Sequence, residues 1–198
     1  MSSDATCNSG IAALGRIPWG SHFCNFYQSA DDLAECVLPF FRQALADNEM
    51  GIWITSEPLN ARDARRRLGA VQPDLAAREA SGQIQILDFA DWYLDSNGSI
   101  TARALHTCLE RLEAAQQRGF AGVRMSGNSF WLERKYWRLF TDYEREMHAA
   151  VRNSRIIVLC SYSVERCTAG DVLEVVKHHD FALSHGPRGW QRIENAAP

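Results

Sequence analysis

The chain has 198 residues, 46% of them hydrophobic, which is enough apolar material for one domain with its own core. Its formal net charge of −3 argues against a nucleic-acid partner that is held by phosphate neutralisation. The sequence contains no apolar stretch of membrane-spanning length, and its first residues lack the basic and apolar parts of a secretion signal. We therefore expect a cytoplasmic protein with no direct nucleic-acid or membrane contact, whose six cysteines are thiols.

Strands and helices are predicted to alternate along the chain. Residues 1–17 are small and polar and predict a flexible arm, followed by a single domain over 18–195. Apolar runs predict strands at 22–27, 51–55, 83–89, 122–126 and 155–161. Apolar residues at helical spacing predict helices at 31–47 with Ser29 as N-cap, within 61–80 with a break near Pro73, and at 100–118, 132–153 and 169–178. Residues 181–185 and 190–194 predict a closing strand or hairpin.

This alternation predicts the α/β class, as a three-layer αβα domain with a mainly parallel sheet. With right-handed crossovers, the carboxyl ends of the strands lie along one edge of the sheet. Those ends fall at 25–27, 55–57, 88–89, 126–128 and 160–162. Open α/β sheets usually bind their ligands at this edge, so we expect the functional site there.

Motifs for nucleotide and acyl-transfer chemistry are missing from the sequence. There is no G-x-x-x-x-G-K-[ST] loop to wrap a phosphate, and no G-x-G-x-x-G fingerprint. The G-x-S-x-G turn that exposes a nucleophilic serine is also missing. We therefore expect a protein that is not an enzyme, with no catalytic residues and no cofactor.

A thiol- or metal-dependent enzyme is the alternative that the cysteines and histidines leave open. Cys160 precedes His178, His179 and Asp180, but it ends an apolar run and we interpret it as a core residue. His22 and Cys24 would share one face of a strand, and Cys167 follows Cys160 by seven positions. None of these has the paired C-x2-C spacing of a zinc site, so we predict no metal.

The segment 122–144 combines a cation in a predicted central strand with a heavy aromatic load. Arg124 must be paired if it is buried, and we expect Glu57 or Glu144 as its partner. It then either holds the long helix to the sheet or anchors a polar ligand. Aromatic residues near the predicted edge favour a pocket for an organic molecule. The candidate ligand-binding residues are His22, Cys24, Tyr27, Trp53, Glu57, Arg124, Asn128, Trp131, Glu144 and Tyr162.

Long, ordered segments of the chain resemble the MEDS family, the sensory domain of methanogen and methylotroph signalling proteins that include DcmR. The resemblance covers about 19–194. It is carried by WGSHFCNFYQSADDL (19–33), NEMGIWITSEPL (48–59), GQIQIL (82–87), GVRMSGNSFWLE (122–133) and LCSYSVERC (159–167).

This resemblance implies a RecA/KaiC-like fold that has lost its P-loop. It also implies a non-catalytic sensory or regulatory role, with a small organic molecule such as a simple hydrocarbon derivative as ligand. The signal would pass to a partner such as a histidine kinase or a transcriptional regulator. RecA-like folds often pair, so a homodimer is expected by analogy. The alternative is a protein–protein interaction module that keeps this fold without a ligand.

Overall fold

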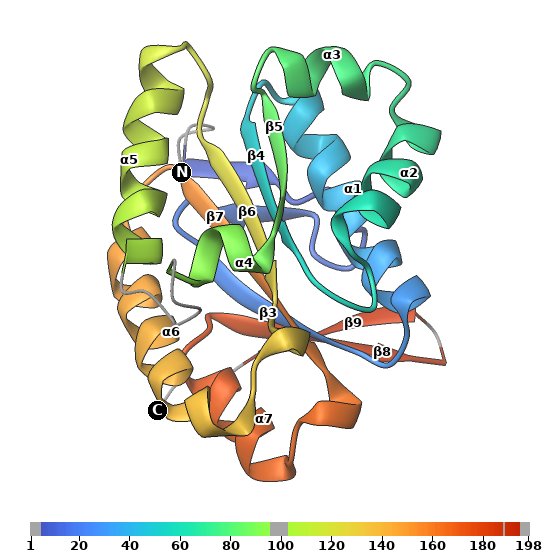
Figure 1. Ribbon diagram of the computed structural model, residues 1–198, viewed down its shortest axis with the longest axis vertical. Coiled ribbons are helices and arrows are strands. Elements are labelled where there is room, and N and C mark those ends of the chain that lie inside the picture. Colours follow the sequence, from blue (N-terminus) through green and yellow to red (C-terminus); the bar gives the residue numbers. More distant parts are fainter. Residues whose placement is uncertain (1–4, 96–102, 188, 195–198) are drawn as a thin grey trace.

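A seven-stranded sheet forms the centre of the protein in the computed structural model, which describes residues 5–95, 103–187 and 189–194 (Figure 1). The strand order is β5-β4-β6-β7-β3-β8-β9. All neighbouring strands run parallel except β9, which pairs antiparallel with β8. The strands are β3 (His22–Tyr27), β4 (Met50–Thr55), β5 (Ile84–Asp88), β6 (Val123–Asn128), β7 (Ile156–Ser163), β8 (Phe181–Gly186) and β9 (Gly189–Glu194). The predicted α/β class and mainly parallel sheet are confirmed.

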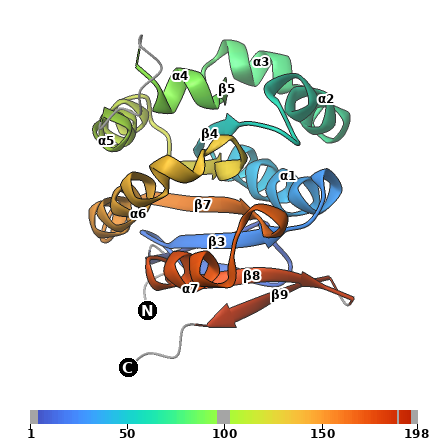
Figure 2. The ribbon, with the colours of Figure 1, turned by 60° about the horizontal axis from the view of Figure 1, so that its bottom comes forward.

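Helices cover both faces of the sheet and give the domain three layers (Figure 2). One face carries α1 (Ala30–Ala46), α2 (Ala61–Val71) and α3 (Leu75–Ala80). The other carries α4 (Phe89–Tyr93), α5 (Arg103–Gln117), α6 (Trp137–Val151) and α7 (Ala169–Lys177). Short 3-10 turns follow β6 and β7: η2 (Ser129–Trp131), η3 (Arg134–Tyr136) and η4 (Val164–Arg166). Among the described residues, no helix combines the length and apolar character needed to cross a bilayer.

Local sequence signals explain where several helices begin and end. Ser29 caps α1, because its hydroxyl accepts from the Asp32 amide at 3.1 Å while the Asp32 carboxylate accepts from the Ser29 amide at 3.1 Å. The predicted N-cap is therefore confirmed. The predicted break near Pro73 is also confirmed, since a residue that precedes proline is pushed out of helical geometry. The short helix α4 was not predicted.

The strand β6 is longer than predicted, and this changes the geometry of the sheet edge. We expected a strand over 122–126, but Gly127 and Asn128 continue the ladder opposite Cys160 and Ser161 of β7. Glycine is needed here for packing, because a Cβ atom at position 127 would lie 2.7 Å from the Tyr93 hydroxyl. The helix predicted over 132–153 begins only at Trp137, after η3. Residues 100–102 of the helix predicted at 100–118 lie outside the described residues.

Residues 5–18 pack against the domain, although we predicted a flexible arm over 1–17. They form the antiparallel hairpin of β1 (Thr6–Asn8) and β2 (Arg16–Pro18). Ile11 and Ile17 are buried in the same core as α1, which explains why this short segment is ordered. The prediction of a flexible arm is wrong for this part. The small polar residues suggested disorder, but the burial of Ile11 and Ile17 in the core holds the segment in place.

Arg124 ties this hairpin to the sheet. Its guanidinium is fully buried and forms a bidentate pair with Glu49, with Nε to Oε2 at 2.7 Å and Nη2 to Oε1 at 2.9 Å. The remaining N–H groups donate to the backbone carbonyls of Asn8, Ser9 and Phe40 at 2.9–3.0 Å. The predicted pairing with Glu57 or Glu144 is wrong, because Arg124 lies near the amino end of β6 and points towards α1.

Candidate ligand-binding site

At the carboxyl edge of the sheet, three predicted residues brace the strand ends. The Tyr27 hydroxyl donates to Asn128 Oδ1 at 2.8 Å, and Asn128 Nδ2 donates to the Glu57 carbonyl at 2.9 Å. Asn128 Oδ1 also accepts from the Phe130 amide at 3.3 Å, which starts η2. The Glu57 carboxylate accepts from Asn60 Nδ2 at 3.2 Å. Tyr27 and Asn128 therefore link the carboxyl ends of β3 and β6 to the segment that follows β4.

Trp131 belongs to an aromatic stack beside this edge. Its ring stacks on Phe89 and Tyr93, with ring centroids 5.0 Å and 5.1 Å away. Phe140 of α6 meets both Tyr93 and Trp131 edge-on. The stack fills the space between α4, η2 and α6. Trp131 is thus one of several packed aromatic rings there.

Two predicted residues lie on the opposite face of the sheet. Trp53 of β4 stacks on Phe41 of α1, with ring centroids 5.1 Å apart. Arg124 directs all its donors to Glu49 and to backbone carbonyls. Both side chains pack on the side of α1 and are at most 3% exposed, so neither lines an open site. The sequence placed them on the correct strands but could not tell which face each one joins.

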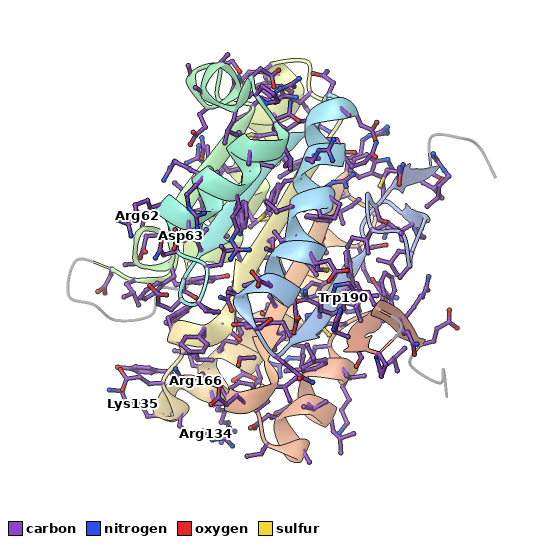
Figure 3. All side chains as sticks on the ribbon, turned by 90° about the vertical axis from the view of Figure 1, so that its right-hand side faces the viewer. Arg62, Asp63, Arg134, Lys135, Arg166 and Trp190 are labelled. Atoms are coloured by element: carbon purple, nitrogen blue, oxygen red, sulfur yellow. The ribbon has the colours of Figure 1, made fainter. Side chains whose placement is uncertain are left out.

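A small pocket opens at the carboxyl ends of β6 and β7. We call it the edge pocket; its volume is about 90 Å³ and it is lined by Ser129, Phe130, Leu132, Arg134, Trp137, Ser163, Arg166 and Cys167. Figure 3 shows Arg134 and Arg166 gathered with Lys135 at one end of the molecule, away from Arg62 and Asp63 on α2. The edge pocket thus lies where the predicted edge site was expected, although its lining residues differ from the predicted set.

The two arginines of the edge pocket, Arg134 and Arg166, each pack against an aromatic ring. The Arg166 guanidinium lies 4.5 Å from the centroid of the Phe130 ring, and that of Arg134 lies 5.4 Å from the Trp137 ring. Arg134 is also paired with Asp171 of α7, with Nη1 to Oδ2 at 2.6 Å. Burial raises the pKa of Cys167 to about 11, so its sulfur is a neutral thiol at pH 7. The pocket therefore offers positive charge beside apolar walls.

Four buried side chains meet beneath α6 and α7, and we call them the buried cluster: His22, Glu144, Cys160 and His179. The Glu144 carboxylate oxygen Oε2 lies 3.1 Å from His22 Nε2, 3.5 Å from His179 Nε2 and 3.4 Å from Cys160 Sγ. His22 Nε2 lies 3.3 Å from Cys160 Sγ. Each of the four is at most 8% exposed. β3, β7, α6 and the segment after α7 each supply one of them.

The electrostatics of the buried cluster favour an anionic carboxylate beside a neutral His22. Burial, helped by the neighbouring His179 ring, lowers the pKa of His22 to about 4. Burial by itself would raise the pKa of Glu144, but the contacts with His179 and His22 outweigh it and hold that pKa below its ordinary value. Burial and the Glu144 charge raise the pKa of Cys160 well above its ordinary value.

Cys24 and Tyr162 complete the surroundings of the buried cluster. Cys24 lies opposite Cys160 in the β3–β7 ladder, and its side chain joins the same core. Tyr162 is fully buried and meets the His179 ring edge-on at a centroid distance of 6.0 Å. Its hydroxyl has no hydrogen-bond partner among the described residues. Four of the predicted residues, His22, Cys24, Glu144 and Tyr162, are thus brought together.

The sequence-based site omitted residues that the structure makes central. Cys160 and His179 belong only to the alternative of a thiol- or metal-dependent enzyme, and the apolar run before Cys160 favours a core residue. The alternation of β7 predicts only that Cys160 and Tyr162 share a face, and the register with β3 shows that it is the face of His22 and Cys24. Arg166 and Cys167 follow β7 directly and were not selected as ligand residues. Their contribution depends on η4, which turns them back over the edge.

Comparison with known proteins agrees with this architecture. The family model MEDS, described as the methanogen/methylotroph, DcmR sensory domain, matches residues 21–180. The crystal structure of a KaiC-like protein from the hyperthermophilic archaeon Pyrococcus horikoshii OT3 is similar, with a TM-score of 0.63 at 16% identity. The match covers 94% of this chain and 85% of that chain, which confirms the RecA/KaiC-like fold. A comparison with curated proteins gave no match.

Proposed function

Because the chain belongs to the MEDS family of sensory domains, we propose that it is a non-catalytic sensor that binds a small organic molecule in the edge pocket. The observation that carries this proposal is the pocket itself, at the carboxyl ends of β6 and β7. Parallel α/β sheets bind their ligands at such strand ends.

The chemistry of the edge pocket indicates what kind of molecule fits. A volume of about 90 Å³ has room for only a few heavy atoms, on the order of six, if each takes about the 15 Å³ of one water-sized probe. Phe130, Leu132 and Trp137 offer apolar contact, and Arg166 offers charge. We therefore propose a C1 to C3 compound with one polar or anionic group, in the range of simple hydrocarbon derivatives.

The amino end of α1 supports a role without nucleotide hydrolysis. P-loop proteins hold phosphate on the amide groups at the start of the helix that follows their first sheet strand. Here the Asp32 carboxylate accepts from the amides of Gln28 and Ser29 at 3.0 Å and 3.1 Å. A phosphate at this position would meet a carboxylate instead of free amides, and the two negative charges would repel.

A binding panel on the purified chain tests the proposed ligand class. Thermal shift and calorimetry would use formate, acetate, methylamine, methanol, dichloromethane and ATP as probes. We expect at least one of the C1 to C3 compounds to raise the melting temperature, and ATP to leave it unchanged. Arg166→Gln should weaken binding of the best anionic or polar probe at least tenfold, because a charge-assisted contact is worth about 1.5–3 kcal/mol.

The matched control is Arg62→Gln, which removes an exposed cation on α2, far from the pocket in Figure 3. It should bind like the unchanged protein. If Arg166→Gln and Phe130→Ala both keep the full affinity for every compound that binds, the edge pocket is not the sensory site.

Exposed apolar residues on the elements around the edge pocket support a partner for signalling. Leu139 of α6, Val164 of η4 and Leu173 of α7 are 50%, 43% and 66% exposed. We propose that this surface meets a signalling protein of the cytoplasm, such as a histidine kinase or a transcriptional regulator, or a second copy of the chain. Light scattering of the chain and of Leu173→Asp, with and without the bound compound, tests the second copy. A mass that is monomeric under all these conditions would leave only a different protein as partner.

A further inference from the structure

Four of the six separations between the donor atoms of the buried cluster match the spacing in a tetrahedral metal site. His22 Nε2, Glu144 Oε2, Cys160 Sγ and His179 Nε2 lie within 4.8 Å of one another. Four of the distances between them are 3.1 Å, 3.3 Å, 3.4 Å and 3.5 Å. Metal–ligand bonds of about 2.0–2.3 Å in a tetrahedron place neighbouring donors about 3.3–3.6 Å apart. The side chains therefore need only small shifts to surround one ion.

The orientation of the His179 ring suits a metal ion at the centre of the cluster. His179 Nδ1 lies 2.7 Å from the Val175 carbonyl, which can only accept, so this nitrogen carries a proton. In a neutral ring, Nε2 then presents its lone pair to Glu144 Oε2 at 3.5 Å. The contact therefore stabilises the Glu144 carboxylate when a second ring proton or a metal ion lies between the two atoms. A backbone carbonyl that fixes the far nitrogen is also the usual support of a metal-binding histidine.

The charge balance of the cluster favours the same conclusion. Glu144 is 3% exposed, and within the described part of the chain its ion-pair partners are the two histidines, with no Lys or Arg. A buried carboxylate without a compensating cation is costly. A divalent ion would neutralise Glu144 together with a Cys160 thiolate, leaving both imidazoles neutral.

We propose that His22, Glu144, Cys160 and His179 bind one divalent transition-metal ion of the Zn²⁺ type, because their four donor atoms converge within 4.8 Å of one another. Two imidazoles, one thiolate and one carboxylate are ligands typical of Zn²⁺, whereas Ca²⁺ and Mg²⁺ prefer oxygen. Cys160 releases its proton to the solvent when it binds the ion. With four protein ligands the site is closed, which is the arrangement of a structural ion that stiffens α6 and α7 against the sheet.

A surface pocket lies beside residues that neighbour the cluster in the chain. It has a volume of about 280 Å³, and its lining includes Ser21 and Asp180, which are chain neighbours of His22 and His179. The Asp180 carboxylate accepts from the His22 amide at 2.9 Å and so connects the lining of this pocket to a residue of the cluster. The same lining includes the cations Arg152 and Arg192.

Cobalt substitution on the full chain tests the site directly. The protein would be treated with a chelator at neutral pH and then titrated with Co²⁺ and with Zn²⁺. We expect one equivalent of Co²⁺ to give a thiolate-to-metal charge-transfer band and the strong visible bands of a tetrahedral site. Zn²⁺ should displace it and raise the melting temperature. Cys160→Ser should abolish the charge-transfer band, and His179→Gln should weaken the affinity for Zn²⁺ at least tenfold.

The matched control is Cys108→Ser, since Cys108 is buried on the same face of the sheet but its sulfur contacts Met125 Sδ at 3.1 Å. It should bind Co²⁺ with an unchanged spectrum. Co²⁺ that binds the unchanged protein without a thiolate band, or at less than one equivalent, overturns the proposal even if the Cys160 variant does not fold. A doubly protonated His179 ring at neutral pH in the presence of Zn²⁺, seen by nitrogen NMR, would overturn it as well.

Discussion

The Arg124 guanidinium and the Glu49 carboxylate form a fully buried bidentate pair, with both N···O distances below 3.0 Å. The pair lies at the amino end of β6, and the guanidinium also donates to the carbonyls of Asn8, Ser9 and Phe40. It therefore joins the N-terminal hairpin, α1 and the central strand in one hydrogen-bonded unit.

Removing the charge of Glu49 should destabilise the protein strongly. Glu49→Gln leaves a buried guanidinium without its counter-ion, and a change of this kind costs about 3–5 kcal/mol. Urea unfolding followed by circular dichroism measures it. The matched control is Asp63→Asn. Asp63 pairs with Arg66, and their side chains are 31% and 69% exposed, so this ion pair should contribute less than about 1 kcal/mol. Equal losses in the two variants would contradict the role given to the buried pair.

The N-terminal hairpin should contribute to the stability of the domain. Ile17 is fully buried against α1, so Ile17→Ala should lower the free energy of unfolding by about 2–5 kcal/mol. Ala13→Ser, an exposed change in the same segment, should shift it by less than about 0.5 kcal/mol. The midpoints of urea unfolding compare the two. If Ile17→Ala left the free energy of unfolding unchanged, the hairpin would not contribute to stability, as the predicted flexible arm over 1–17 implied.

Asp171 should stabilise the start of α7 in a pH-dependent way. Although burial tends to raise it, the pKa of Asp171 lies below its ordinary value of 3.8, because Arg134 and Thr168 donate hydrogen bonds to the carboxylate. A lowered pKa means that the unfolded chain binds the proton more readily. The contribution is therefore complete above the ordinary pKa and is lost as the pH falls towards the folded value.

Asp171→Asn should consequently cost about 1 kcal/mol at pH 7, and progressively less as the pH falls below about 3.8. Unfolding curves at pH 7, 5 and 3 would show this. The control Asp142→Asn removes an exposed partner of Arg145 on α6 and should have a small effect at every pH. A cost that stays constant down to pH 3 would mean that the carboxylate charge is not what stabilises α7.

Gly127 should tolerate no side chain without disturbing the aromatic stack. A Cβ atom there would lie 2.7 Å from the Tyr93 hydroxyl, and Tyr93 stacks on Trp131. Gly127→Ala should therefore cost about 1–3 kcal/mol and change the tryptophan fluorescence. Gly186→Ala, where a Cβ atom meets nothing within 4 Å, serves as the control in another strand. Unchanged emission and stability in Gly127→Ala would contradict the tight contact.

The elements were predictable from the sequence where local chemistry decides them. The strand at 22–27, the N-cap at Ser29 and the break at Pro73 all depend on neighbours within a few residues. The partner of Arg124 was not predictable in this way, because Glu49 lies 75 positions earlier in the chain. Burial against α1, not local pattern, decides that pairing.

The candidate site was predictable in its location more than in its composition. The carboxyl edge follows from the parallel strand order, and a pocket is present there. Part of its lining comes from η2, η3 and η4, whose short turns leave no periodic pattern in the sequence, and Trp137 and Ser163 come from α6 and β7. The buried cluster needed the pairing of β3 with β7, which places Cys160 beside Cys24 and cannot be read from either strand alone.

The start of α1 is closed to an anion twice over. Only Gln28 and Ser29 separate β3 from α1, so a glycine-rich loop has no room without an insertion. The Asp32 carboxylate would also have to be lost before the helix amides became free. Opening this helix end to a phosphate would therefore take a longer connection and the loss of Asp32 together, since either change alone leaves the amides unavailable. The short connection and the carboxylate thus close the same position independently, and a single substitution cannot reopen it.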